Sequence, residues 1–231
     1  MTVAALILAA PPESALADAA GRPAVRRIAE VAWAGGAVPL IVIAFDADGR
    51  VGSALAGSEA KLVEPAATGS GPAGHIVQGM GAARESIGET DAVLIWPARM
   101  TWVDAETVTS LLQAHGLEPS AVVRPTWQGH AGWPALVPLE HAGTLSRASR
   151  DLLPDALLDD LVVAGVASRL LESGDPGTTL DISVALDSLP DYEGPSGPLG
   201  GPPPEWGEAV GAGDDDASPL EGPSLAPYDR A

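Results

Sequence analysis

Residues 39–45 constrain the fold of this chain most strongly, because every side chain in this run is apolar. A strand without polar alternation is typical of a parallel sheet that helices cover on both faces. Residues 3–10 and 92–96 are similar apolar runs, and residues 23–34 between the first two have helical spacing. Strands that alternate with helices predict a three-layer α/β fold with a mostly parallel sheet.

The rest of residues 1–189 continues this alternation. Asp104 and Gly116 are suitable residues for the beginning and the end of one helix. His115, in its last turn, is expected to interact with the helix dipole. We expect further helices at residues 73–84, 152–163 and 166–171, and strands at residues 62–66, 121–124, 135–137 and 178–184. Ligands of such sheets bind beyond the strand ends, so we expect the site in the loops after Ala10, Phe45 and Trp96.

Residues 190–231 have a different composition. They contain nine prolines, eight glycines and nine acidic residues, with Arg230 as the one cation. Such a segment has too little apolar surface to offset the entropy of ordering. We therefore predict an α/β domain at 1–189 and a disordered acidic tail at 190–231. Trp206 or Tyr228 could contact a protein partner, and a solubilising extension is the alternative we favour.

Charge and composition exclude several functions. A net charge of −19 would repel nucleic acids and anionic membranes rather than attract them. The absence of cysteine excludes disulfides and thiolate zinc sites, and the single lysine, Lys61, excludes a P-loop. No apolar run reaches the roughly 18–20 residues of a membrane span. The start of the chain resembles a secretory signal, but no basic residue precedes Arg22. We expect a buried strand there and a cytoplasmic protein.

Two local motifs have competing interpretations. Residues 69–74 satisfy G-x-G-x-x-G, which could hold a pyrophosphate at a helix N-terminus and would make the protein an NAD binder. This remains a minor alternative, because the motif does not follow the first strand. Asp46 and Asp48 follow the apolar run at 39–45. They could hold a metal bound to a nucleotide, but we favour an ordinary turn.

Five segments, in this order, resemble the MobA-like nucleotidyltransferases, especially the molybdenum-cofactor cytidylyltransferases. Leu8-Ala9-Ala10 resembles the start of the family's L-A-A-G loop, and residues 21–38 resemble its G-x-P-L-L helix, which leads into A-x-A-G-A. Residues 91–107 resemble its strand and loop D-A-V-L-V-x-x-x-D-x-P-x-V. Residues 125–134 resemble its motif P-x-y-x-G-x-x-G-H-P, and residues 175–187 resemble its motif D-x-G-x-x-x-D-I-D-T-P-E-D. The resemblance implies a Rossmann-like nucleotidyltransferase fold, magnesium and a nucleoside triphosphate as cofactors, and a nucleotide or pterin-type ligand.

The resemblance also implies which residues form the site. On the nucleotide side they are Ala9, Ala10, Gly79 and Arg99; on the substrate side they are Gly129, His130, Gly132 and Trp133; and Asp181 is the candidate metal ligand.

This chain departs from the family pattern where the chemistry is expected. The family's first loop, G-x-S-x-R-M-G-x-x-K, binds phosphates, whereas Pro11 and Pro12 follow Ala10 here and supply no amide donor. Arg99 stands at the position of the magnesium-binding Asp, and Ser183 replaces the second Asp of D-I-D. The His of G-H-P is also replaced. Without these charges, transfer is expected to be weak or absent.

The alternative is a non-catalytic binding or assembly module for cofactor maturation or for a protein partner. In that case Arg99, Arg124 and Trp133 could hold a base or an anion without metal.

Overall fold

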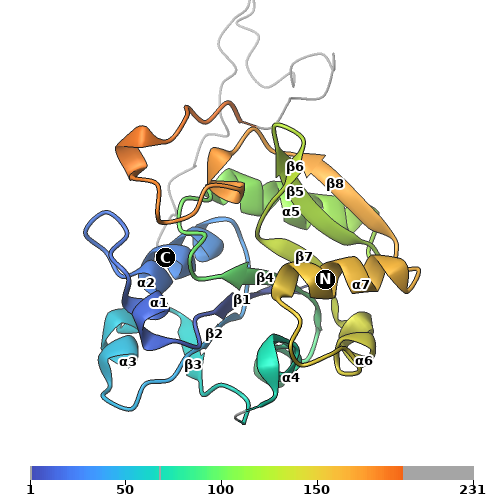
Figure 1. Cartoon of the computed structure of the whole chain (residues 1–231), viewed down its shortest axis with the longest axis horizontal. Coiled ribbons are helices and arrows are strands. Elements are labelled where there is room, and N and C mark those ends of the chain that lie inside the picture. The colour runs from blue at the N-terminus through green and yellow to red at the C-terminus, as the bar shows by residue number, and fades with distance from the viewer. Residues whose placement is uncertain (1, 68, 195–231) are drawn as a thin grey trace, which may run out of the picture. The chain divides into compact units, whose positions relative to one another are not determined.

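A computed structural model describes residues 2–67 and 69–194. One mixed sheet lies at its centre in the strand order β3-β2-β1-β4-β7-β5-β6, and β8 pairs with β5 (Figure 1). The strands are β1 (Thr2–Leu8), β2 (Leu40–Ile43), β3 (Ala60–Val63), β4 (Thr90–Pro97), β5 (Val122–Trp127), β6 (His130–Ala131), β7 (Ala135–Pro138) and β8 (Ser168–Glu172).

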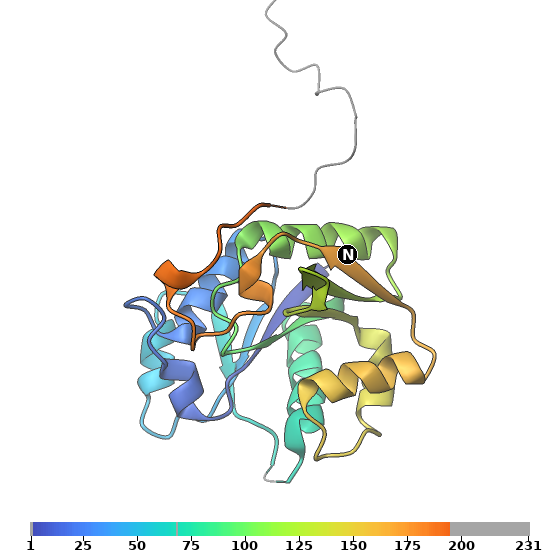
Figure 2. The same cartoon turned by 45° about the horizontal axis from the view of Figure 1, so that its top comes forward.

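Helices cover both faces of the sheet, which makes the three layers that the sequence predicts. The helices are α1 (Pro12–Leu16), α2 (Ala24–Ala34), α3 (Arg50–Leu55), α4 (Gly71–Ser86), α5 (Ala105–Leu117), α6 (Ala142–Leu145) and α7 (Pro154–Val163), with short 3-10 helices at Leu139–His141, Pro176–Thr178 and Leu186–Ser188. The helices α2 and α5 pack on one face, and α4, with α6 and α7 beside it, packs on the other (Figure 2).

The strand directions bring several loops to one edge of the sheet. The pairs β1–β2, β1–β4, β2–β3 and β5–β8 are parallel, which confirms the mostly parallel sheet. Strand β7 runs antiparallel to both β4 and β5. The beginning of β7 therefore lies at the same edge as the ends of β4, β5 and β8.

Most of the predicted elements are confirmed. The apolar runs form β1, β2 and β4, whose side chains are almost entirely buried. Asp104 caps α5 as expected, because its carboxylate accepts a hydrogen bond of 2.9 Å from the amide of Glu106. Asp46 also acts as a cap: its carboxylate oxygens accept from the amides of Val51 (2.7 Å) and Gly52 (2.9 Å) in α3. This agrees with the turn interpretation of Asp46.

Two predicted elements are wrong. Residues 166–171 were expected to be a helix, but residues 168–172 form β8, which pairs in parallel with β5. The exposure of β8 alternates with period two, a signal that five residues are too few to establish. Residues 178–184 were expected to be a strand, but they form a 3-10 turn and bends.

The predicted tail lies mostly outside the described residues, including Trp206 and Tyr228. The described part of that segment contacts the domain: the Tyr192 hydroxyl donates to Glu106 (3.1 Å) and the amide of Glu193 donates to the Gly174 carbonyl (3.3 Å). The boundary between 189 and 190 stays a prediction. Within the described ranges, no helix has the length and apolar character that crossing a membrane requires.

His115 lies in the last turn of α5, where its ring is buried. Its side chain is 1% exposed, and neither ring nitrogen has a hydrogen-bond partner among the described residues. Its Nε2 faces Oδ1 of Asp91 at 3.7 Å. Burial is the main cause that lowers the pKa of His115. The position of His115 in the last turn is as expected, burial opposes the charged form of its ring, and its interaction with the helix dipole stays a prediction.

Lowering the pH from 7.5 to 5.5 is expected to destabilise the wild type more than a His115→Gln variant. A histidine in the unfolded chain takes up a proton near pH 6.5, whereas burial lowers the pKa of His115 in the folded state. The folded chain then binds fewer protons, so its stability falls as the pH drops below about 6.5, by at most about 1.4 kcal/mol per pH unit. Urea unfolding across this range measures the difference. The exposed His130→Gln variant is the control, and equal pH dependence of wild type and His115→Gln would contradict the prediction.

Candidate ligand cleft

A cleft of about 220 Å³ lies at the edge of the sheet where β4 ends and β7 begins. It brings together five residues that the sequence selects from three distant segments. The residues that line it are Arg99, Met100, His130, Ala131, Gly132, Trp133, Asp155, Thr178, Thr179 and Asp181. Of the three loops in which we expected the site, the cleft includes the one that follows β4.

Backbone hydrogen bonds hold the segment after β8 against this edge. The amide of Ile182 donates to the Arg99 carbonyl (2.8 Å), and the amide of Trp133 donates to the Thr178 carbonyl (2.8 Å). A Cβ on Gly132 would overlap the Thr178 carbonyl, so this close approach requires glycine. Residues 178–182 therefore form one wall of the cleft although they are not a strand.

Arg99, Asp155 and Asp181 line the cleft, and Arg124, which does not line it, pairs with Asp155. Arg99 lies between two carboxylates: its Nη2 is 4.0 Å from Oδ2 of Asp155, and its Nε is 3.9 Å from Oδ2 of Asp181. Arg124 pairs with the other oxygen of Asp155 at 3.0 Å. The hydroxyl of Ser183 donates to Asp181 (2.6 Å), which is the main cause that lowers the pKa of Asp181, and Arg99 adds to it. Asp181 is therefore ionised, and the four charges balance.

Trp133 lines the cleft, and its ring packs against Arg124. The Arg124 guanidinium lies 5.4 Å from the centre of the indole, and Trp133 is only 3% exposed. The Nε of Arg124 also donates to the carbonyl of Gly132 (3.3 Å). The two side chains therefore pack on each other and support the wall of the cleft, and their role in holding a base or an anion stays a prediction.

The other predicted site residues lie outside the cleft. Ala9 and Ala10 follow β1, where the amide of Ala9 donates to the Ile43 carbonyl (2.9 Å). Gly79 lies in the middle of α4, where a Cβ would overlap the side chain of Leu6. Close packing of α4 on the sheet accounts for this glycine, and its assignment to the nucleotide side stays a prediction. Gly129 has a φ of 78° in the turn between β5 and β6, next to His130.

The loop after β1 has few groups that could hold a phosphate. Pro11 and Pro12 have no amide hydrogen, and the amides of Ser14 and Ala15 donate to the Pro11 carbonyl (3.0 and 3.3 Å). Arg22, the first cation of the chain, pairs with Glu30 at 2.7 Å. The loss of the family's phosphate loop stays a prediction from the sequence.

The cleft residues do not fit a magnesium ion. Within residues 2–67 and 69–194, no three His, Asp or Glu side chains come together in a way that could hold a metal. The two carboxylates of the cleft, Asp155 and Asp181, face guanidinium groups, and a guanidinium repels a cation rather than ligating it. Asp181 alone is not enough for the oxygen-rich coordination that magnesium needs.

The glycine motif at 69–74 follows the edge strand β3 and leads into α4. In dinucleotide-binding folds the motif follows the first strand, at the point where the strand order reverses. Gly71 has a φ of 64°, and a Cβ there would overlap the Arg150 carbonyl, so packing accounts for this glycine. NAD binding stays a minor alternative.

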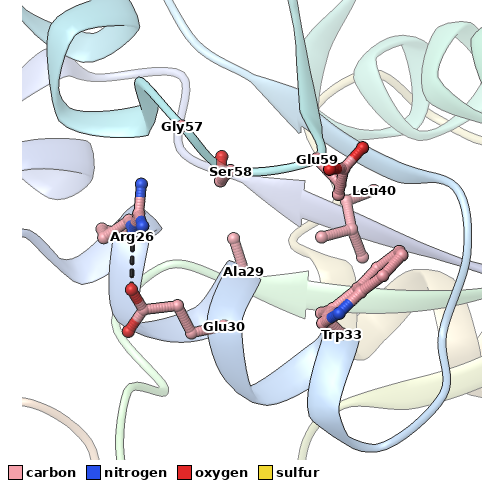
Figure 3. Close-up of a pocket in the computed structure, with 8 residues that line it drawn as sticks. All are labelled: Arg26, Ala29, Glu30, Trp33, Leu40, Gly57, Ser58 and Glu59. Carbon is pink, nitrogen blue, oxygen red and sulfur yellow. Dashed lines mark hydrogen bonds and ion pairs between the residues drawn. The ribbon is translucent and has the colours of Figure 1, made fainter.

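A second groove, of about 250 Å³, lies near the beginnings of β2 and β3, beside α2. Figure 3 shows the indole of Trp33 at one end of the groove, and Arg26 joined to Glu30 at the other. That ion pair measures 2.6 Å, and Trp33 is 52% exposed. None of the site residues selected from the sequence lies in this groove.

Sequence reasoning missed Asp155 and the two threonines of the cleft. Asp155 lies in the first turn of α7, where an acidic residue is ordinary, so nothing in the sequence distinguished it. The segment 175–187 was selected, but Thr178 and Thr179 were not assigned a role. Only the path of the chain after β8 shows that they line the cleft.

Solved structures of nucleotidyltransferases share this fold. A nucleotidyl transferase from Methanothermobacter superposes with a TM-score of 0.64 at 17% identity, over 80% of this chain and 94% of that one. Rv0371c from Mycobacterium tuberculosis, solved in complex with manganese, gives 0.59 at 18%, over 81% and 96%. The 2-C-methyl-D-erythritol 4-phosphate cytidylyltransferase of Thermus thermophilus gives 0.60 at 18%, over 82% and 96%. No curated protein matches the sequence.

The sequence itself matches one protein family, described as the MobA-like NTP transferase domain, over residues 13–173. The match covers more than half of the chain. It begins after Pro11 and Pro12, the residues at which the family's phosphate loop is missing. The resemblance seen in the sequence is therefore confirmed at the level of the family: the chain belongs to the MobA-like NTP transferases and has their Rossmann-like α/β fold.

Proposed function

We propose that this chain is a divergent nucleotidyltransferase-fold protein that binds a polar ligand in the cleft and transfers nucleotides weakly or not at all. The loop after β1 carries this proposal. It contains no cation before Arg22, and Pro11 and Pro12 remove two amides. The resemblance to the family implies that the phosphates of a nucleoside triphosphate would bind at this loop, which here lacks those donors and cations.

The charges of the cleft support the same conclusion. A triphosphate would have to compete with Asp155 and Asp181 for Arg99 and Arg124. Phosphoryl-type transfer depends on cations and metal ions that neutralise the charge developing in the transition state. Removing a single group that stabilises such charge costs about 2.7–4 kcal/mol, or roughly 10²–10³ in rate. This chain lacks the basic loop and also a donor set for magnesium.

The ligand class follows from the cleft and from the family together. The accessible side chains are charged or polar, with Arg99 and Asp155 each more than half exposed. A nucleotide or a pterin-type molecule, as the resemblance to the molybdenum-cofactor cytidylyltransferases implies, carries matching polar groups. The form of the non-catalytic alternative that we favour is a role in cofactor maturation. In that role the chain would bind such a molecule or a protein partner.

A competing function is an active transferase that uses magnesium and CTP or GTP. The family match over residues 13–173 and the manganese complex of the mycobacterial relative favour it. The first loop and the cleft charges of this chain oppose it. NAD binding through residues 69–74 has neither the position in the fold nor the comparisons in its favour.

Pyrophosphate release tests this proposal. The full chain is incubated with CTP or GTP, magnesium and a pterin-type acceptor, and we expect release at least about 100-fold slower than an active relative assayed in parallel. A His130→Ala variant is the matched control, because the side chain of His130 lines the cleft and is exposed. Fast magnesium-dependent release that falls in His130→Ala would refute the proposal.

A further inference from the structure

We propose that the guanidinium of Arg99 is a built-in cation that takes the place of a divalent metal in this cleft. The proposal deepens the proposed function and rests on it in taking this cleft as the ligand site. Arg99 follows β4 in the turn where the family resemblance expects a metal-binding Asp. Its guanidinium lies 4.0 Å from Asp155 and 3.9 Å from Asp181.

The position of the backbone explains why the replacement of an aspartate by an arginine matters at residue 99 in particular. The Arg99 carbonyl accepts from the amide of Ile182 at 2.8 Å, so residue 99 is fixed beside Asp181. A short carboxylate at position 99 would therefore lie next to that of Asp181, and Asp155 would approach from α7. The chain thus keeps the elements of an acidic site, with an arginine in its centre.

Charge balance explains what the arginine does there. Two carboxylates that lie close together without a cation raise each other's pKa by repulsion. The hydrogen bond from Ser183 is the main cause that lowers the pKa of Asp181, and the charge of Arg99 makes a smaller contribution in the same direction. A guanidinium keeps its charge at every pH at which the protein is folded. The cleft is therefore neutralised permanently, whereas a metal-dependent relative is neutralised only when the ion is bound.

A stabilising role alone does not account for Arg99. Its side chain is 56% exposed, and both of its ion pairs are long, so their contribution to stability is small. Arg124, only 12% exposed and 3.0 Å from Asp155, already anchors α7 to β5. What Arg99 adds is a positive charge at the point where the carboxylates would otherwise attract a divalent cation.

Manganese titration of Arg99→Asp tests the proposal on the full chain, with Mn²⁺ alone as the probe. The substitution removes a cation and adds a carboxylate beside Asp181, so we expect Mn²⁺ to bind at least about tenfold more tightly than to the wild type. Arg169→Asp is the matched control: it makes the same change of charge next to Glu118, its ion-pair partner at 2.9 Å, which follows the end of α5. Equal affinity in Arg99→Asp and Arg169→Asp, or in Arg99→Asp and the wild type, would overturn the proposal.

Two further variants distinguish an effect of the charge of Arg99 from an effect of its shape. They also provide a test if Arg99→Asp folds poorly. Mn²⁺ is expected to raise the Tm of Arg99→Ala, which exposes the two carboxylates, but to leave the wild type and Arg99→Lys unchanged. A Tm of Arg99→Lys that responds to Mn²⁺ as much as that of Arg99→Ala would contradict a role for the charge. Fast magnesium-dependent pyrophosphate release by the wild type would refute the proposed function without changing these metal comparisons.

Discussion

Replacement of Asp175 by alanine is expected to destabilise the chain by about 3 kcal/mol or more. Asp175 is 2% exposed, and its carboxylate accepts from the amide of Asp104 (2.8 Å), the hydroxyl of Thr107 (2.7 Å) and the amide of Gly177 (2.8 Å). Each buried donor left without an acceptor costs about 1–3 kcal/mol. The carboxylate joins the beginning of α5 to the segment that forms the wall of the cleft, so its removal loosens both.

Urea unfolding followed by circular dichroism measures this effect. Asp187→Ala is the matched control, because Asp187 is exposed on the same segment and lacks these buried contacts; its change is expected to stay within about 0.5 kcal/mol. A loss below about 1 kcal/mol in Asp175→Ala would show that the three hydrogen bonds do not hold the segment. Burial raises the pKa of Asp175, so the carboxylate is kept in place by its donors rather than by solvent.

The central strands could be predicted from sequence because their signal is local. A run such as 39–45 is apolar at every position, and few structures other than a covered strand bury all of it. The signal for the beginning of α5 was also local, since Asp104 caps it, whereas Gly116 lies inside the helix, which ends at Leu117. The errors came from elements that other parts of the chain decide. Strand β8 exists because β5 offers it a free edge, and its own five residues resemble a helix turn as much as a strand.

The site could be predicted only in part, because local motifs mark some of its residues and the packing of distant elements brings in the others. Arg99, Trp133 and Asp181 could be selected because family motifs mark them, although 82 residues separate the first from the last. Asp155 lies beside them and Gly79 does not, because of how α7 and α4 pack against the sheet. No spacing in the sequence encodes that packing. The ion pairs of Arg99 likewise required coordinates, since the sequence showed the substitution but not its partners.

Loss of magnesium-dependent nucleotide binding is the second large effect that we expect. An intact phosphate loop holds a triphosphate through amides, basic side chains and the bound metal. This chain has Pro11 and Pro12 in that loop, and the carboxylates of its cleft face arginines. With these contributions absent, the affinity for a magnesium–nucleotide complex should be lower than that of an active relative by at least about 100-fold, or about 2.7 kcal/mol. Any weak binding to the cleft should be equally strong with and without magnesium.

Calorimetric titration of the full chain with CTP and GTP, in magnesium and again in EDTA, tests this most directly. We expect either no measurable heat of binding or one dissociation constant that magnesium does not change. His130→Ala, which alters the cleft but not the first loop, identifies any weak binding as binding to the cleft. Tight binding that requires magnesium and disappears in EDTA would contradict the account, because it would mean that this chain still assembles the nucleotide and metal site of its family.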